Sequence, residues 1–258
     1  MEPVRSFCKD SLAVRIYADR TAMGAAAARD GAALLRRLLA QQDTVRAVFA
    51  AAPSQNEFLE ALCAAPDLDW KRVTAFHMDE YVGLDAAAPQ GFGNFLRARV
   101  FDRLPFGQVC YLNGNAPDIE AECSRYAGLL AQAPIDIVFM GIGENGHIAF
   151  NDPPVAEFDD PAAVKVVALD EVCRNQQVHD GCFADIGQVP THALTLTVPT
   201  LAGAKHHLCI VPAPTKAKAV RDTLEGPVST ACPASILRTC PGAVLYLERE
   251  SAQLLTEV

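Results

Sequence analysis

Short apolar runs alternate along the chain with longer segments in which apolar residues recur every three or four positions. The short runs are rich in β-branched residues, which is typical of buried strands. The run at 135–140 is the most continuous of them. We predict strands at 14–17, 45–51, 73–78, 135–140, 164–169, 193–198, 208–211 and 243–247.

The periodic segments predict helices, because residues three and four apart lie on one face of a helix. Helices are expected at 21–39, 57–63, 92–104 and 119–130, and from 216 to 224. Strands that alternate with helices form βαβ units. The predicted fold is therefore α/β, with a single-domain, mainly parallel, Rossmann-like sheet and helices on both faces, spanning 1–258.

Composition narrows the class of ligand and the compartment. The formal net charge of −9 argues against nucleic acid and anionic membrane as partners, since both require clustered basic residues. A small anionic substrate stays compatible with it. No apolar run approaches the roughly 20 residues of a membrane span. The nine cysteines are odd in number and contain no C-x-x-C pair, which favours reduced thiols and a cytoplasmic location.

Polar residues follow two of the predicted strands directly. Asp79 and Glu80 come after 73–78, and His147 follows the glycine-rich segment 141–146. Ligands of α/β sheets bind at the carboxyl ends of strands. A carboxylate and an imidazole meeting there can transfer protons to and from a small substrate. The apolar turn 81–84 is expected to desolvate Asp79 and raise its pKa. The structural alternative for this acidic pair is a solvated loop or a helix cap.

The segment 141–146 also matches the G-x-G-x-x-G pattern of dinucleotide-binding loops. That pattern requires a helix directly after the loop, and Pro153 and Pro154 cut any such helix short. Asp170 nevertheless lies about where a ribose-binding acid would lie, so the nucleotide alternative stays open. In the other interpretation, the glycines let the backbone approach a small ligand and aim His147 inward.

Three further positions are candidates for binding a phosphate. Ser54 and Gln55 precede a predicted helix whose N–H groups and dipole attract anions, although Ser54 to Glu57 also matches a capping box. Lys216 follows the strand 208–211, and Arg174 lies in a polar segment after 164–169. Solvated side chains are the structural alternative for both cations. Metal binding has little support, because His206 and His207 would point to opposite faces of a strand.

Three segments carry a resemblance to a known family: Met78 to Leu84, Leu112 to Asp118, and Gly143 to Pro153 with the sequence GENGHIAFNDP. Together with Gln188-Val189-Pro190 they resemble the glucosamine-6-phosphate deaminase (isomerase) family, within the larger group that includes the 6-phosphogluconolactonases. The resemblance runs from about residue 45 to 247. It implies the conversion of glucosamine 6-phosphate and water to fructose 6-phosphate and ammonia, without a metal or an organic cofactor.

The resemblance also implies residue roles. Asp79 would move a proton between carbons 2 and 1 through an enol intermediate. His147 would open the sugar ring with help from Asn145 and Asp152. The phosphate would be held by Ser54 and the loop around it, which includes Gln55, and by Arg174 and Lys216.

Three departures from the family pattern bear on these roles. Asn145 replaces the Asp of some members, and Asp152 is one methylene shorter than the usual Glu. The usual Thr-Gly-Gly-Thr phosphate loop is replaced by 52–56, so galactosamine 6-phosphate is an alternative substrate. The loop 155–163 lacks groups for a second phosphate, so no activation by N-acetylglucosamine 6-phosphate is expected.

A homo-oligomer is possible. A lactonase-type hydrolase and a non-catalytic sugar-phosphate sensor are the remaining alternatives.

Overall fold

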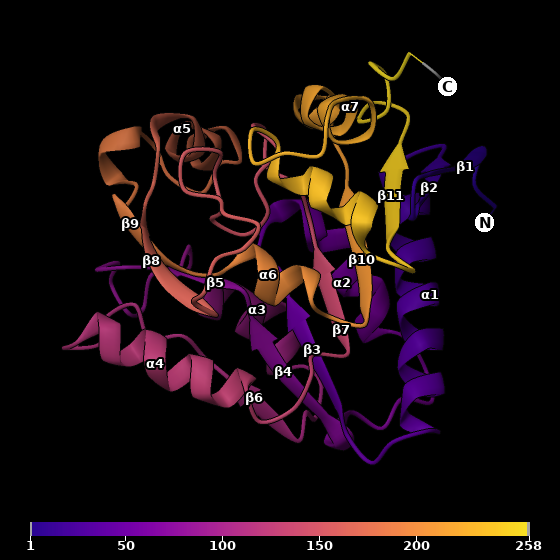
Figure 1. Ribbon diagram of the computed structural model, residues 1–258. Coiled ribbons are helices and arrows are strands. Elements are labelled where there is room, and N and C mark those ends of the chain that lie inside the picture. The colour runs from indigo at the N-terminus through magenta and orange to yellow at the C-terminus, as the bar shows by residue number, and fades with distance from the viewer. Residues whose placement is uncertain (1, 257–258) are drawn as a thin grey trace.

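Eight strands form one sheet in the computed structural model, which describes residues 2–256. Their order is β1-β2-β11-β10-β7-β3-β4-β6 (Figure 1), and every neighbouring pair except β1 and β2 is parallel. The strands are β1 (Arg5–Lys9), β2 (Leu12–Tyr17), β3 (Val45–Phe49), β4 (Val73–His77), β6 (Gln108–Cys110), β7 (Ile137–Met140), β10 (His206–Val211) and β11 (Val244–Glu248).

Helices cover both faces of this sheet, as predicted. Neighbouring residues of β3 point to opposite faces: Phe49 belongs to a buried cluster with α1 and α2, whereas Val48 belongs to a cluster with α4 and α7. Burial on both faces explains why the central strands are continuous apolar runs. The helices are α1 (Arg20–Leu39), α2 (Asn56–Cys63), α3 (Phe92–Leu96), α4 (Ile119–Leu130), α5 (Glu171–His179), α6 (Val198–Ala202) and α7 (Ala217–Glu225).

A second, smaller sheet is antiparallel and was not expected. It has the order β5-β9-β8 and consists of β5 (Asp79–Tyr81), β9 (His192–Leu196) and β8 (Val164–Ala168). The strands predicted at 164–169 and 193–198 therefore exist, but they do not join the parallel sheet. Apolar periodicity reports which residues are buried, and it does not report which strand pairs with which.

Several element boundaries also differ from the prediction. We did not predict β1, β5, β6, α5 or α6 from the sequence, because these elements are short or polar. The helix expected at 92–104 is α3 followed by the π-helical η3 (Arg97–Phe101). The remaining turns of 3₁₀ helix are η1 (Pro53–Gln55), η2 (Trp70–Arg72), η4 (Ile186–Gln188), η5 (Pro214–Lys216) and η6 (Pro233–Thr239).

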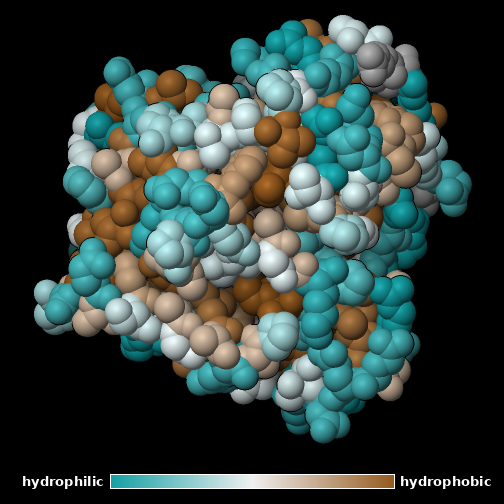
Figure 2. Space-filling model, viewed as in Figure 1, coloured by the Kyte–Doolittle hydropathy of each residue, from teal (hydrophilic) through white to brown (hydrophobic). Residues whose placement is uncertain are grey.

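The surface is polar around an apolar interior. In Figure 2, hydrophilic residues cover most of the outer rim of the face shown, and hydrophobic ones gather in its central hollows. Among the described residues, no helix has both the length and the apolarity that crossing a membrane requires. Figure 1 shows α5 and α7 on the side of the sheet to which the parallel strands point. This side carries the cavity described next.

Candidate active site

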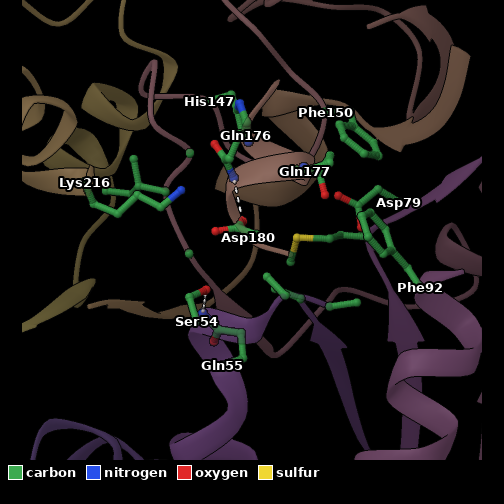
Figure 3. A pocket seen from close by; sticks show the side chains of 18 residues that line it. Ser54, Gln55, Asp79, Phe92, His147, Phe150, Gln176, Gln177, Asp180 and Lys216 are labelled. Atoms are coloured by element: carbon green, nitrogen blue, oxygen red, sulfur yellow. Dashed lines mark hydrogen bonds between the residues drawn. The ribbon is translucent and has the colours of Figure 1, made fainter. Parts of the chain in front are cut away.

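One cavity lies beyond the carboxyl ends of the four adjacent strands β10, β7, β3 and β4 (Figure 3). The segments that follow these strands line it, and one face of α5 closes it. Five of the residues predicted from sequence line this cavity together: Ser54, Gln55, Asp79, His147 and Lys216. Residues far apart in the sequence thus converge because parallel strands all end at one edge of the sheet.

Asp79 is buried in the cavity wall with an unsatisfied carboxylate. It is the first residue of β5, where it pairs with Thr195, and it is 6% exposed. Its Oδ1 has no hydrogen-bond partner among residues 2–256. Burial raises the pKa of Asp79 well above its ordinary value, and the nearby Glu80 carboxylate raises it further. A carboxyl group in this state is suited to accept a proton from carbon near neutral pH.

Apolar residues surround Asp79 on its cavity side. They include Met78, Phe92 and Phe150, and Tyr81 of the turn predicted to desolvate Asp79 packs against both phenyl rings. Leu84 lines a separate depression instead. The desolvation itself was predicted correctly, because burial is the largest cause of the raised pKa of Asp79.

The neighbouring carboxylate has a structural role. Glu80 accepts hydrogen bonds from three backbone N–H groups, those of Tyr81 at 2.9 Å, Phe92 at 3.0 Å and Gly93 at 2.8 Å. Two of these donors belong to the first turn of α3, whose N–H groups lack partners within the helix. The two adjacent acids are therefore distinct: Glu80 holds α3 in place, and Asp79 is the one available to a substrate.

His147 is held by a carboxylate and an amide. Its Nδ1 lies 2.8 Å from Oδ1 of Asp152, and Nδ2 of Asn145 donates to the same oxygen at 2.8 Å. The backbone N–H of His147 donates to Oδ1 of Asn145 at 3.0 Å. Neither Asn145 nor Asp152 lines the cavity, so each would act on a bound molecule only through the imidazole.

The ionisation of Asp152 fixes the tautomer of the imidazole. Burial alone would raise the pKa of Asp152, but the charge and hydrogen bonds of His147, together with the Asn145 amide, hold it below its ordinary value. An ionised carboxylate only accepts hydrogen bonds, so Nδ1 carries the proton. In the neutral imidazole, the other ring nitrogen, Nε2, is then left with its lone pair available to a ligand.

Because Gly143 has no side chain, the imidazole of His147 can pack against its Cα. A Cβ at position 143 would lie 2.2 Å from both Cε1 and Nε2 of the His147 ring, so any residue other than glycine would force the ring to move. Gly146 has a φ of +86°, in the left-handed region that favours glycine. The glycines of this loop thus serve to place His147, as one of the two interpretations proposed.

The dinucleotide alternative finds no support in the geometry. Residues 144–146 form a turn, and the short bridge between Ile148 and Asn151 follows in place of a helix. Asp170, the candidate ribose ligand, is the N-cap of α5 and accepts from the backbone N–H of Cys173 at 2.6 Å. The Asp170 carboxylate therefore caps a helix and is not available to a ribose.

Lys216 is a buried cation without a partner in the described part of the chain. It ends η5 directly after β10, and it is 4% exposed. Its ammonium makes no hydrogen bond or ion pair with any residue from 2 to 256. Burial lowers the pKa of Lys216, although the carboxylates of Asp180 and Glu144 counteract this effect. A buried, unpaired ammonium at a cavity wall is a strong candidate for binding an anion.

Ser54 and Gln55 line the cavity across from Lys216, and all three residues lie at the end away from Asp79 (Figure 3). The Gln55 amide donates to the Ile210 carbonyl at 3.1 Å and to Ser54 Oγ at 3.2 Å, and its Oε1 has no partner. The capping box considered for Ser54 does not form, because neither η1 nor α2 has a side-chain cap. Glu57 forms an ion pair with Arg20 at 2.7 Å instead.

Arg174 is not brought to the cavity. Its guanidinium donates to the carbonyls of Ile186 at 2.6 Å and Val189 at 3.0 Å, and so holds the segment that precedes β9. The segment that contains it is α5, where residues 173, 176, 177 and 180 share one face. Gln176, Gln177 and Asp180 from this face line the cavity, and sequence analysis missed all three. Asp170, a residue type common at helix N-caps, was the signal in the sequence that could have predicted α5. The register of this helix turns Arg174 away from the cavity.

A group of three side chains with metal-ligand spacing also lies here. Ligand atoms of His147, Asp152 and Cys173 are within 4.8 Å of one another, and all three residues are buried. However, Nδ1 of His147 is already bonded to Asp152. Burial and the Asp152 carboxylate raise the pKa of the Cys173 thiol, which disfavours the thiolate that a metal requires. The donor set fits a proton relay better than a metal centre.

Comparison with known proteins places the chain in a family. The model of the family of glucosamine-6-phosphate isomerases/6-phosphogluconolactonase matches residues 18–246, so the resemblance starts well before position 45. The chain is 38% identical over 202 residues to glucosamine-6-phosphate deaminase of Listeria innocua, covering 78% of this chain and 84% of that relative. It is 39% identical over 190 residues to the Bacillus thuringiensis protein of the same name, covering 74% and 71% of the two chains.

Solved structures agree with this assignment. A monomeric glucosamine-6-phosphate deaminase superposes with a TM-score of 0.85 at 30% identity, over 93% of this chain and 99% of its own. A 6-phosphogluconolactonase from Thermotoga maritima superposes with a TM-score of 0.74 at 20% identity, over 92% and 99%, which shows a shared fold alone. The chain therefore belongs to the family of glucosamine-6-phosphate isomerases and 6-phosphogluconolactonases.

Proposed function

We propose that this chain converts glucosamine 6-phosphate and water to fructose 6-phosphate and ammonia. The observation that carries the proposal is a single cavity that holds the unpaired Asp79 carboxylate, the His147 imidazole and the unpaired Lys216 ammonium. Relatives named glucosamine-6-phosphate deaminase support the choice of substrate. The site residues are assigned on geometry and chemistry.

Ring opening is the proposed role of His147. Its Nε2 takes the proton of the hydroxyl on carbon 1 and returns one to the ring oxygen, which gives the open-chain aldehyde. The Asp152 carboxylate stabilises the imidazolium that forms between these two transfers, and Asn145 orients the carboxylate.

Proton transfer between carbons is the proposed role of Asp79. Its carboxylate removes the proton from carbon 2, next to the aldehyde, while the ammonium group on carbon 2 gives a proton to the carbon-1 oxygen. The product is an enol that carries a neutral amino group. Return of that proton to carbon 1 produces an iminium at carbon 2. Water then adds to carbon 2 and ammonia leaves, which gives the ketose. Acid–base chemistry of this kind needs only a positioned carboxylate, and we propose no metal or organic cofactor.

Phosphate binding is assigned to Lys216, Ser54 and Gln55, which lie together at one end of the cavity. The contact between Arg174 and phosphate stays a prediction. It requires the guanidinium to leave the carbonyls of Ile186 and Val189, so Arg174→Gln is expected to alter the position of that segment as well as binding.

Initial rates of ammonia release test the function. Glucosamine 6-phosphate should be turned over with a higher kcat/KM than galactosamine 6-phosphate, and 6-phosphogluconolactone should not be hydrolysed above the spontaneous rate. A preference for the galactosamine substrate would reassign the epimer. Hydrolysis of the lactone without ammonia release would indicate the lactonase alternative, and binding without turnover would indicate the sensor.

We extend the proposal to compartment, assembly and regulation. All nine cysteines are unpaired thiols, which is consistent with a reducing cytoplasmic setting. A homo-oligomer stays a prediction that sedimentation velocity can test, and the solved deaminase named above is monomeric. N-acetylglucosamine 6-phosphate is expected not to activate the enzyme, and a rate increase at sub-saturating substrate would contradict this.

A further inference from the structure

A carboxylate lies at the end of the cavity assigned to the phosphate. Asp180 is the C-cap residue of α5, half-buried, and it lines the cavity together with Lys216 and Ser54 (Figure 3). Within residues 2–256, its side chain has one hydrogen bond, a weak one from the Gln176 amide to Oδ2 at 3.4 Å. The carboxylate is therefore free to interact with whatever binds to Lys216.

A second carboxylate adds to the negative charge at this end. The backbone N–H of Glu144 donates to the Gln176 side chain at 2.7 Å, which ties its loop to α5. Oε1 of Glu144 is buried without a partner, and Oε2 is 3.4 Å from Nδ1 of the exposed His179. Lys216 is the sole Lys or Arg among the residues that line the cavity.

These charges conflict with strong binding of a phosphate dianion. A sugar phosphate carries about −1.5 to −2 charge at pH 7. It would gain the attraction of the Lys216 ammonium and meet the repulsion of the Asp180 carboxylate at the cavity wall. A neutral hydrogen-bond donor, such as the hydroxyl of an unphosphorylated sugar, would meet no such repulsion. Like charges placed against a ligand are an established means of lowering affinity for the wrong partner.

We propose that Asp180 is a specificity-determining residue that weakens binding of a phosphate dianion at Lys216. Its carboxylate thereby reduces the ratio of kcat/KM for a phosphorylated hexosamine to kcat/KM for the unphosphorylated one. The inference rests on the proposed function for its choice of substrate. The effect of the Asp180 charge on phosphate affinity is a property of the cavity and can be measured without turnover.

The test compares the wild type with three variants by calorimetric titration with inorganic phosphate. Asp180→Asn keeps the shape and the acceptor for Gln176 but removes the charge. Lys216→Met removes the ammonium. Asp43→Asn is the matched control, because Asp43 is exposed and precedes β3, at the opposite edge of the sheet from the cavity.

The expected result is that Asp180→Asn binds phosphate about 5- to 30-fold more tightly than the wild type. Lys216→Met should lose this binding, and Asp43→Asn should stay within twofold of the wild type. Unchanged affinity in Asp180→Asn, an equal gain in Asp43→Asn, or no phosphate binding to either the wild type or Asp180→Asn would overturn the inference.

Kinetics then separate the inference from the proposed function. In Asp180→Asn, KM for glucosamine 6-phosphate should fall by a similar factor, while kcat/KM for glucosamine stays unchanged, so the ratio between the two substrates widens. Tighter phosphate binding without any ammonia release by the wild type would refute the proposed function and leave the electrostatic role of Asp180 standing. If the variants turn over substrate but Asp180→Asn does not increase the ratio of kcat/KM for glucosamine 6-phosphate to that for glucosamine, the role of Asp180 in substrate preference is refuted.

Discussion

Two adjacent acids in this chain have opposite roles, and hydrogen bonding decides which is which. Glu80 is satisfied by three backbone N–H groups, whereas an oxygen of Asp79 has none. The sequence could identify the pair and the strand that precedes it. It could not separate the two residues, because two of the three donors to Glu80 come from α3, more than ten positions away along the chain.

Asp79→Asn should lower kcat by about 10²–10⁴-fold or more, since an amide cannot accept the proton from carbon 2. Substrate affinity should change little, because the amide has nearly the same shape. Ammonia release and equilibrium binding of glucosamine 6-phosphate measure the two effects. Retained turnover would remove Asp79 as the base.

The raised pKa of Asp79 also predicts a pH dependence of stability. The folded state holds the proton more tightly than the unfolded state, whose pKa is near 3.8. Stability therefore falls as the pH rises from this value through the folded pKa, and the cost of burying the charge is fully present above it. Asp79→Asn should raise Tm at pH 8 relative to the wild type and leave it nearly unchanged at pH 3.5. An equal shift at both pH values would contradict this.

Asp152→Asn tests the relay behind His147. The amide can donate to Nδ1 and so favour the tautomer in which Nε2 carries the proton, which predicts a fall in kcat of about 10²–10⁴-fold. Because the folded pKa of Asp152 is depressed, its contribution to stability is present above about 3.8 and is lost as the pH falls through the folded value. Thermal unfolding from pH 7 downward should show this loss in the wild type and not in the variant.

At the scale of elements, helix register determined which predictions succeeded. Lys216 was placed correctly because η5 follows a buried strand of the parallel sheet. Arg174 was not, because its segment was interpreted as a loop, whereas as α5 it turns Gln176 and Gln177 toward the cavity. Local pattern predicts a helix only when its apolar face is evident, and the cavity face of α5 is polar.

The glycine-rich loop after β7 gives a prediction at this scale. Gly143→Ala would place a Cβ 2.2 Å from the His147 ring, so the ring must move. We expect a loss of about 1–3 kcal/mol in the free energy of unfolding and a large fall in kcat. Gly128→Ala is the control, because no atom lies within 4 Å of its Cβ position in α4, and it should stabilise by about 0.5–1 kcal/mol. Equal effects of the two substitutions on activity would contradict the role of Gly143.

At the scale of the whole molecule, the parallel sheet could be predicted and the second sheet could not. Continuous apolar strands such as 135–140 identify a sheet buried on both faces. The pairing of β5 with β9 joins Asp79 to Thr195, and no local pattern encodes a contact of that sequence separation. The cavity was predictable in outline for the same reason, since four of its walls follow strands of the parallel sheet.

We propose that residues 1–258 behave as one domain. The two buried clusters lie on opposite faces of a shared sheet, and the antiparallel sheet contributes residues to both of them. Thermal unfolding should therefore give one transition, coincident by calorimetry and by far- and near-ultraviolet circular dichroism. Two resolved transitions would show that the small sheet and α5 unfold as a separate unit.

Asp79, His147 and Lys216 are proposed to act together on one sugar phosphate. A crystal structure of the Asp79→Asn variant with glucosamine 6-phosphate would show whether they do. We expect carbon 2 about 3–3.5 Å from the residue-79 side chain, the ring oxygen or the carbon-1 hydroxyl within hydrogen-bond distance of His147 Nε2, and the phosphate on Lys216. A sugar bound outside this cavity, or bound in it with the phosphate at the Asp79 end, would refute the proposal.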